Sequence, residues 1–318
     1  MHKILLAHPF IGAYSACLLA GMLGGYLLTR RQAVRTGIKS SHVDNLALLI
    51  AVFSLFGARL FSWLFYYPPG TNLWRALWDP SGGMVFYGGM IFGALTLLIY
   101  ARAAKLELSN LLDTFAPGLA LGLALGRVGC FMAGCCWGDV CVDAKQLAKS
   151  GDPDLSWQIR TVPMISSAGF PLAVRFPDRA GAYEQHLRLG LIDSESQRSL
   201  PVHPVQLYEA ALAFGLCVLL IFRSQRRLWR GQIVCLFLFG YAAIRFATEF
   251  LRADNSPIYF GLTLSQAISL MLAGLALIAW LSREQKTDAD VRPSPLPLPQ
   301  PIEAGVSSAE SSARPVGS

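Results

Sequence analysis

Apolar residues occur in long runs along this chain, not in the short periodic stripes of water-soluble helices. A helix needs about 20 predominantly apolar residues to cross the hydrocarbon core of a bilayer. Seven runs are of this kind: residues 10–28, 44–67, 84–101, 110–134, 204–222, 231–251 and 258–281. The pattern predicts an all-α membrane protein with seven transmembrane helices.

The polar segments between these runs alternate in charge. Loops one, three and five and the start of the C-terminal tail are basic, whereas residues 68–83 and 252–257 each balance one arginine against one aspartate. Cytoplasmic loops carry the excess of Lys and Arg, so the alternation predicts an outer N-terminus and a cytoplasmic C-terminus. The first run lacks a convincing cleavage site and is expected to remain as a signal-anchor. The basic residues are Arg30, Arg31, Arg35, Lys39, Arg102, Lys105, Arg223, Arg226, Arg227, Arg230, Arg283 and Lys286.

We place the membrane domain at residues 1–283, and two segments of the chain do not have the composition of a membrane helix. The first lies within this domain: residues 139–203 are mixed in charge and rich in turn residues, and they predict a small outer head between helices four and five. Within this head, "PLAVRFP" (171–177) alternates as a short strand does. Residues 284–318 are rich in Pro, Ser, Ala and Gly, and we expect a disordered cytoplasmic tail.

Composition agrees with a membrane protein. Hydrophobic residues make up 53% of the 318 positions and charged residues only 15%, against about 25% charged residues in soluble domains. A formal charge of +7 would also suit a nucleic-acid partner. The positive residues lie in short blocks between apolar runs, however, so we expect no nucleic acid.

Ionisable residues inside the apolar runs need a partner or a polar cavity, because each costs a few kcal/mol at bilayer depth. Arg245 and Glu249 have the i,i+4 spacing of an ion pair on one helix face. Arg127 has no acidic neighbour within one helical turn, so it requires a partner from another helix or an anionic ligand. Arg59 has the same need unless it extends to the outer interface. The full set is Arg59, Asp113, Arg127, Glu209, Arg245 and Glu249.

Several intramembrane arginines, together with an outer head, favour a phospholipid with an anionic headgroup as the ligand. The planar guanidinium offers phosphate a fork of donors. The alternative is a transporter or channel for a small anion, which would place discontinuous helices in matched halves of the chain. The sequence does not show that pattern.

Small residues gather at three places. "GMLGG" (21–25) and "GLALGLALG" (118–126) predict close helix packing. In "GGMVFYGG" (82–89), Tyr87 is either an aromatic residue of the membrane interface or part of a site where the glycines let a substrate or backbone approach.

Seven cysteines are present, four of them within twelve residues. Cys130, Cys135, Cys136 and Cys141 lack the paired CxxC spacing of zinc sites and have no nearby histidine, so we expect neither a metal ion nor a cofactor. Two alternatives remain for this group. Cys141 forms a disulfide with Cys135 or Cys136, or the cysteines pack as small apolar residues. Outside this group, we expect apolar packing for Cys17, Cys217 and Cys235.

From the first run to about residue 282, the sequence resembles the prolipoprotein diacylglyceryl transferase family of bacterial inner-membrane enzymes. Several short motifs carry this resemblance. Each motif alone is weak evidence for the family, but all of them in this order, together with seven apolar runs, are specific for it. The motifs are "GARLFSWLFYY" (57–67), "GGMVFYGG", "DTFAPGLALGLALGRVGCF" (113–131), "GCCWG" (134–138), "LAVRFP" (172–177), "HPVQLYEA" (203–210), "GYAAIRFATEFLR" (240–252) and "LTLSQAISL" (262–270).

The resemblance implies a reaction and its partners. The diacylglyceryl group of phosphatidylglycerol moves to the lipobox cysteine thiol of a preprolipoprotein, which forms a thioether and releases glycerol phosphate. It also implies a monomer in the inner membrane, in contact with membrane lipids. By resemblance, the catalytic residues are Tyr87, Arg245 and Glu249, and phosphatidylglycerol contacts Arg127, Tyr14, Gly138, Cys130 and Arg245.

Three positions depart from the best-known members of that family. Tyr87 stands where they carry histidine, Cys130 where they carry asparagine, and Cys135 where they carry glutamate. Histidine suits the base that takes the thiol proton, whereas tyrosine, with a reference pKa of about 10, is a poor base at neutral pH. Tyr87 is then a hydrogen-bond donor to the lipid, with Glu249 or no residue as the base. The alternative function is a non-catalytic relative that binds lipid or lipoprotein.

Overall fold

The computed structural model describes residues 12–68, 70–79, 83–141, 170–178, 180–252 and 261–282. Within these ranges, all regular secondary structure is helical, and seven helices have 18 residues or more. They are α1 (Ala13–Thr36), α2 (Ser40–Tyr66), α4 (Phe86–Ala103), α5 (Leu108–Ala133), α8 (Val205–Ser224), α9 (Gln232–Glu249) and α10 (Leu264–Leu281). Two short helices, α3 (Leu73–Trp78) and α7 (Gly181–Arg188), lie in the connections.

Six of the described helices, α2, α4, α5, α8, α9 and α10, are long and apolar enough to cross a membrane. The chain is therefore a multi-pass membrane protein, as predicted. The first helix, α1, is outside this group: it carries Arg30, Arg31 and Arg35 in its last turns and glycines at its centre. The structure thus supports six of the seven predicted spans, and the membrane placement of α1 stays a prediction.

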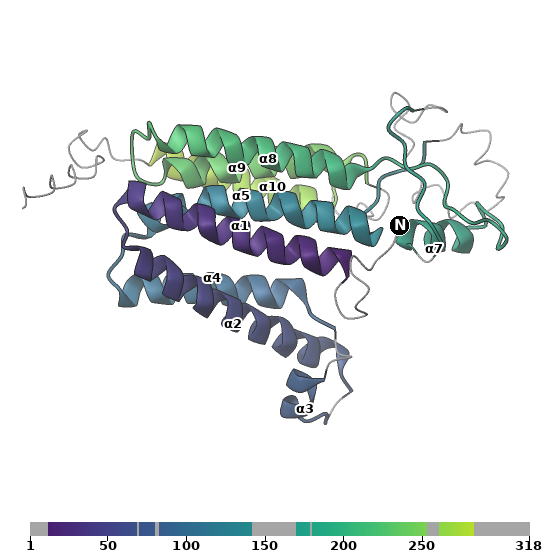
Figure 1. The fold of residues 1–318 in the computed structure, drawn as a ribbon, viewed down its shortest axis with the longest axis horizontal. Coiled ribbons are helices and arrows are strands. Elements are labelled where there is room, and N and C mark those ends of the chain that lie inside the picture. Colours follow the sequence, from purple (N-terminus) through teal and green to yellow (C-terminus); the bar gives the residue numbers. More distant parts are fainter. Residues whose placement is uncertain are drawn as a thin grey trace, which may run out of the picture.

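The long helices lie side by side, and α5 is central (Figure 1). Helix α1 packs along α5, the group α8–α10 lies on one side, and the pair α2 and α4 lies on the other. Successive helices run in opposite directions, so both α3 and α7 are at one end of the bundle, here called the α7 end (Figure 1). The turns 37–39, 104–107 and 225–231 are at the opposite end, here called the basic end.

Glycines bring neighbouring helices into direct backbone contact. A Cβ atom on Gly118 of α5 would lie 2.6 Å from the carbonyl oxygen of Gly25 on α1 and 2.3 Å from Oγ1 of Thr29. Between α2 and α4, a Cβ on Gly88 would lie 2.3 Å from the carbonyl oxygen of Gly57. Such small faces give the close packing that holds helices together in lipid. The packing prediction for both glycine-rich segments of α1 and α5 is confirmed.

Part of the head predicted at residues 139–203 falls within the described residues. There, "PLAVRFP" forms isolated bridges, from Val174 to Val202 and from Pro177 to Arg198, so the predicted strand is absent from this described segment. The side chain of Phe176 is fully buried with Val140 and Val202, which gives the segment a small apolar core. Residues 142–169 of the head, residue 179 and the predicted tail lie outside the described residues.

Candidate active site

Three arginines and two glutamates form a continuous ionic network near the α7 end of the bundle. Nε of Arg127 on α5 lies 2.5 Å from Oε2 of Glu209 on α8. The other oxygen of Glu209 lies 2.9 Å from Nη1 of Arg245 on α9, and Nη2 of Arg245 lies 2.9 Å from Oε2 of Glu249. Nε of Arg252 lies 4.0 Å from the same oxygen of Glu249. We call these five residues the arginine–glutamate network.

Helix direction explains why these residues meet. Arg127 lies six residues before the end of α5 at Ala133, which is about 9 Å along a helix axis. Glu209 lies four residues after the start of α8, and Arg245 four residues before the end of α9, each about 6 Å along the axis. The three side chains are therefore at similar depth. The predicted Arg245–Glu249 pair is confirmed, and the required partner of Arg127 is Glu209.

Hydroxyl groups complete the coordination of both carboxylates. The hydroxyl of Thr248 donates to Oε1 of Glu209 at 2.9 Å, and that of Thr263 donates to Oε1 of Glu249 at 2.6 Å. Thr263 is also the N-cap residue of α10 and forms a capping box with Gln266. Buried charges are tolerated when they are paired and hydrogen-bonded. The start of α10 therefore fixes the position of Glu249.

The network retains positive charge that can meet an anion. Three guanidinium charges against two carboxylate charges leave a net charge of +1. The Arg127 side chain is 21% exposed, and among the described residues its terminal nitrogens have no hydrogen-bond partner. A guanidinium carries five N–H donors, so Arg127 can hold Glu209 and still offer a fork to phosphate.

Gly138 lets the loop after α5 pack beneath the network. Its backbone N–H donates to the carbonyl of His203 at 3.0 Å, and a Cβ atom here would lie 2.5 Å from Cγ2 of Val205. The next residue, Asp139, donates its N–H to the carbonyl of Leu251 at 2.8 Å. The loop is thus held between the start of α8 and the segment Leu251–Arg252 that follows α9.

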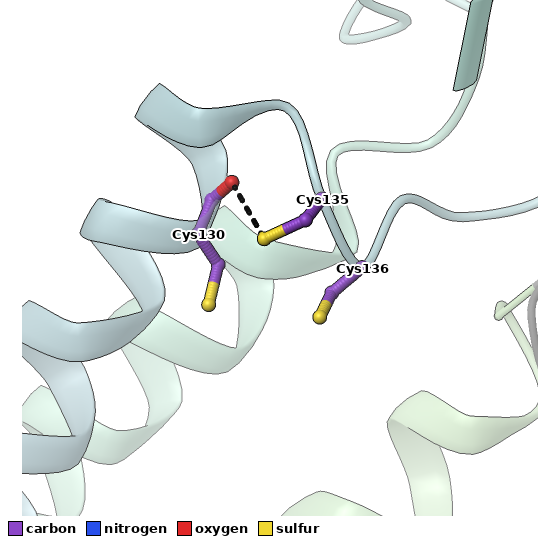
Figure 2. A group of neighbouring side chains, drawn as sticks. All are labelled: Cys130, Cys135 and Cys136. Carbon is purple, nitrogen blue, oxygen red and sulfur yellow. Dashed lines mark hydrogen bonds between the residues drawn. The ribbon is translucent and has the colours of Figure 1, made fainter. Parts of the chain in front are cut away.

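Three cysteines converge at the end of α5 (Figure 2). The Sγ atoms of Cys130, Cys135 and Cys136 all lie within 4.8 Å of one another, and the Cys135 thiol donates to the carbonyl of Cys130 at 3.6 Å. Hydrogen bonds from Cys130 and Cys135, followed by the charge of Arg252, lower the pKa of Cys136. We call these three residues the thiol cluster.

The other cysteines have different surroundings. Cys141 is free and buried, so neither disulfide considered for it with Cys135 or Cys136 is formed, and burial raises its pKa to about 11. Cys217 and Cys235 are buried, as expected of small apolar residues.

Two tyrosines of the predicted site also lie towards the α7 end. Tyr14, near the start of α1, packs against Gly129 of α5, where a Cβ atom would lie 3.2 Å from its ring. Tyr87 lies in the first turn of α4, is 52% exposed, and stacks edge-on against Phe86. The next residue, Gly88, serves the backbone contact with α2 described above. Among the described residues, Tyr87 is not brought into contact with the network.

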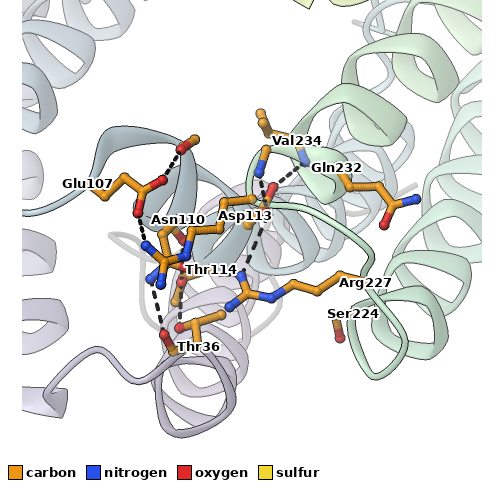
Figure 3. Close-up of polar contacts among 12 residues, drawn as sticks. Thr36, Glu107, Asn110, Asp113, Thr114, Ser224, Arg227, Gln232 and Val234 are labelled. Atoms are coloured by element: carbon orange, nitrogen blue, oxygen red, sulfur yellow. Dashed lines mark hydrogen bonds and ion pairs between the residues drawn. The ribbon is translucent and has the colours of Figure 1, made fainter. Parts of the chain in front are cut away.

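The remaining intramembrane charges belong to structural contacts elsewhere. Asp113, towards the basic end, accepts hydrogen bonds from the N–H groups of Gly231 and Val234 at 2.8 and 2.9 Å, and Arg227 lies 3.6 Å away (Figure 3). It therefore caps the N-terminus of α9. Arg59 donates to the carbonyl of Asp79 at 2.8 Å.

Sequence reasoning did not include two members of the network among the site residues. Glu209 was recognised only as a charge inside an apolar run, and Arg252 only as a loop residue. The available signals were local: Arg252 follows Glu249 by three residues, one helical turn, and Glu209 is the only acidic residue of its run. Which helix would supply the partner of Arg127 required the tertiary structure.

Comparison with known proteins identifies the family of this chain. The family model for prolipoprotein diacylglyceryl transferase matches residues 4–282. Similar proteins named phosphatidylglycerol–prolipoprotein diacylglyceryl transferase occur in Burkholderia multivorans (31% identity, 80% of this chain and 82% of the relative) and Erwinia tasmaniensis (30%, 86% and 88%). A third, in Clostridium tetani, is 25% identical over 82% of this chain and 88% of its own length. The chain therefore belongs to the prolipoprotein diacylglyceryl transferase family and is a membrane-bound transferase.

Proposed function

We propose that this protein transfers the diacylglyceryl group of phosphatidylglycerol to the lipobox cysteine thiol of preprolipoproteins. The products are a thioether and glycerol phosphate. The observation that carries the proposal is the arginine–glutamate network, which has a net positive charge and an incompletely bonded Arg127. An anionic headgroup satisfies both features. Family membership supplies the reaction type.

In the proposed mechanism, Arg127 and Arg245 hold the phosphate of the lipid. Negative charge on this phosphate increases as the bond from carbon to oxygen breaks, and fixed positive groups stabilise that charge in the transition state. Glu249 is fully buried and ion-paired with Arg245, which suits it to positioning the arginines. Glu209 has the same role between Arg127 and Arg245.

Three further residues complete the proposed headgroup site. Tyr14 packs against Gly129 of α5, Cys130 is the next residue of that helix, and Gly138 allows the following loop to pack closely against His203 and Val205. Tyr87, half exposed in the first turn of α4, donates a hydrogen bond to the lipid or its leaving group. Exposure leaves this hydroxyl available to a substrate that enters from the bilayer.

The proposed placement is a bacterial inner membrane with seven spans, α1 included. The N-terminus and the head at residues 139–203 face the periplasm, the tail at residues 284–318 faces the cytoplasm, and the protein acts as a monomer. The arginines and lysines at the basic end support this orientation. Reporter fusions after residues 35 and 227 should indicate cytoplasm, and one near residue 180 should indicate periplasm. A cytoplasmic signal at residue 180 would contradict the seven-span topology.

Complementation tests the activity itself. A strain depleted of its own transferase should grow when this chain is expressed, and its membranes should transfer labelled phosphatidylglycerol to a lipobox peptide. The substitutions at Tyr87, Cys130 and Cys135 favour a second candidate, a relative that binds lipid or lipoprotein without transfer. Correct insertion with no growth and no transfer, when the organism's own lipoproteins are supplied, would favour that candidate.

A further inference from the structure

We propose that Cys130, Cys135 and Cys136 form a three-thiolate zinc site whose fourth position binds the thiol of the acceptor lipobox cysteine. This inference rests on the proposed function and differs from the sequence-based expectation of no metal ion. It gives the protein a means of activating the acceptor thiol that does not depend on a histidine.

The three sulfur atoms are already close to a coordination geometry. They lie within 4.8 Å of one another, and tetrahedral zinc with bonds of about 2.3 Å holds its sulfur ligands about 3.8 Å apart. Side-chain rotation and a small loop movement cover a difference of about 1 Å. Two sulfurs come from the loop and one from α5, as Figure 2 shows.

The backbone folds the loop back over the helix end. Gly134 ends α5 with φ at 69°, in the left-handed region. Cys136 also has a positive φ, 59°, which is uncommon for a residue other than glycine. The side-chain amide of Gln206 on α8 donates to the carbonyl of Cys135 at 2.7 Å. These constraints keep the sulfur atom of Cys136 near those of Cys130 and Cys135 without a disulfide.

The ligand number favours a reactive site. Structural zinc sites have four protein ligands, whereas sites with three keep a position for water or substrate. In the described part of the chain, the group able to hold a metal contains the three cysteines and no fourth His, Cys, Asp or Glu. Three thiolates with one Zn²⁺ carry a net charge of −1, which the network's net charge of +1 offsets.

The reaction needs a thiolate, and zinc supplies one at neutral pH. Coordination releases the proton of the acceptor thiol to solvent, and the zinc-bound sulfur then attacks the diacylglyceryl carbon that is bonded to the phosphate oxygen. The C–S bond forms as the C–O bond breaks, and the electron pair leaves with glycerol phosphate, held by Arg127 and Arg245. The thioether product has no negative charge, so it is a weaker ligand and leaves the site.

Metal binding is tested without reference to activity. Purified protein, reduced and stripped of metal, should bind one equivalent of Co²⁺ with sulfur-to-cobalt charge-transfer absorption and tetrahedral visible bands, and Zn²⁺ should displace it. Serine at Cys130, Cys135 or Cys136 should abolish these bands. Cys17→Ser, at the same end of the bundle, is the matched control and should keep them. Absence of the bands in the wild-type protein, or their persistence in Cys135→Ser, would overturn the site.

Substrate binding and transfer test the fourth position. A lipobox peptide with cysteine should change the cobalt spectrum, whereas the same peptide with serine should not. Removal of zinc should lower transfer about 100-fold or more, as the loss of thiol activation would, and added Zn²⁺ should restore it. Transfer at the full rate without metal would refute the inference and leave the proposed function intact. Metal binding without any transfer in the zinc-loaded protein would instead refute the proposed function.

Oxidation and copper are the competing occupants. Mass spectrometry of protein isolated with thiols blocked should find all three cysteines reduced. A disulfide within the thiol cluster as the native state would overturn the proposal, and so would a site that binds only Cu(I).

Discussion

Glu209 is the residue on which the geometry of the site depends most. Its two oxygens contact Arg127 at 2.5 Å and Arg245 at 2.9 Å, and it also accepts from Thr248. Glu209→Ala removes one of two carboxylates and raises the net charge of the network from +1 to +2. At an effective dielectric constant of about 20, two charges about 4 Å apart attract by about 4 kcal/mol. The two pairs of Glu209 therefore account for about 8 kcal/mol of attraction before solvation.

The net loss of stability is smaller, because the released arginines recover water. Removing one partner from a buried ion pair costs about 3–5 kcal/mol. The exposed fractions of the Arg127, Arg245 and Glu209 side chains are 21%, 14% and 5%, so solvent screens the pairs only in part. If about 2–4 °C corresponds to each kcal/mol, as in domains of similar size, Tm should fall by roughly 6–20 °C.

Thermal unfolding of the detergent-purified protein measures this effect. Glu209→Gln keeps the volume and a hydrogen-bonding oxygen but removes the charge, so its Tm should lie between those of the wild type and Glu209→Ala. Glu184→Ala, on the exposed face of α7, is the control, and its stability should change by less than about 0.5 kcal/mol. A Tm for Glu209→Ala within about 2 °C of the wild type would refute the claim that Glu209 holds the two arginines in place.

Three other changes test separate parts of the structure. Tyr87→Phe should lose most transfer activity at an unchanged Tm, and Tyr87→His should retain some; full activity in Tyr87→Phe would remove this hydroxyl from the mechanism. Gly118→Ala should separate α1 from α5 and cost about 1–3 kcal/mol by thermal melting, whereas Gly126→Ala, with open space at its Cβ position, should not destabilise. Burial lowers the pKa of His186 to about 4 from 6.5. Neutral His186 therefore contributes fully to the free energy of unfolding above pH 6.5, and up to about 3 kcal/mol of that contribution is lost as pH falls from 6.5 towards 4. Protease resistance of α7 should therefore decrease over that interval in the wild type but not in His186→Gln, and an identical decrease in both would contradict this assignment.

The helices were predictable because each apolar run reports the free energy of transferring that segment into lipid. The predicted run 110–134 corresponds to Leu108–Ala133, and 204–222 corresponds to Val205–Ser224. The predicted and observed ends differ most for the first helix, because the apolar run ends at residue 28 whereas α1 continues to Thr36. Hydropathy marks where a chain leaves the bilayer core, whereas backbone hydrogen bonds continue the helix through Arg30 and Arg35.

The candidate site was predictable in its charges but not in its connections. Arg127 stood out because a lone arginine in an apolar run requires a partner, and the i,i+4 pair of Arg245 and Glu249 is local. Glu209 is 82 residues from Arg127, and only the packing of α8 against α5 brings them together. The close approach of the three thiols was not predictable for a related reason, since a positive φ at Cys136 lets spacings other than CxxC bring sulfur atoms together.

The central claim is that the arginines of the network carry the phosphate charge of the lipid during transfer. The most direct test is the rate at which inserted Arg127→Ala and Arg127→Lys proteins move labelled diacylglyceryl from phosphatidylglycerol to a lipobox peptide in membranes. We predict a loss of at least about 100-fold for Arg127→Ala and a clear loss for Arg127→Lys, because lysine lacks the planar fork. Arg188→Ala, on α7, should transfer at the wild-type rate. A near-normal rate in correctly inserted Arg127→Ala would contradict the account.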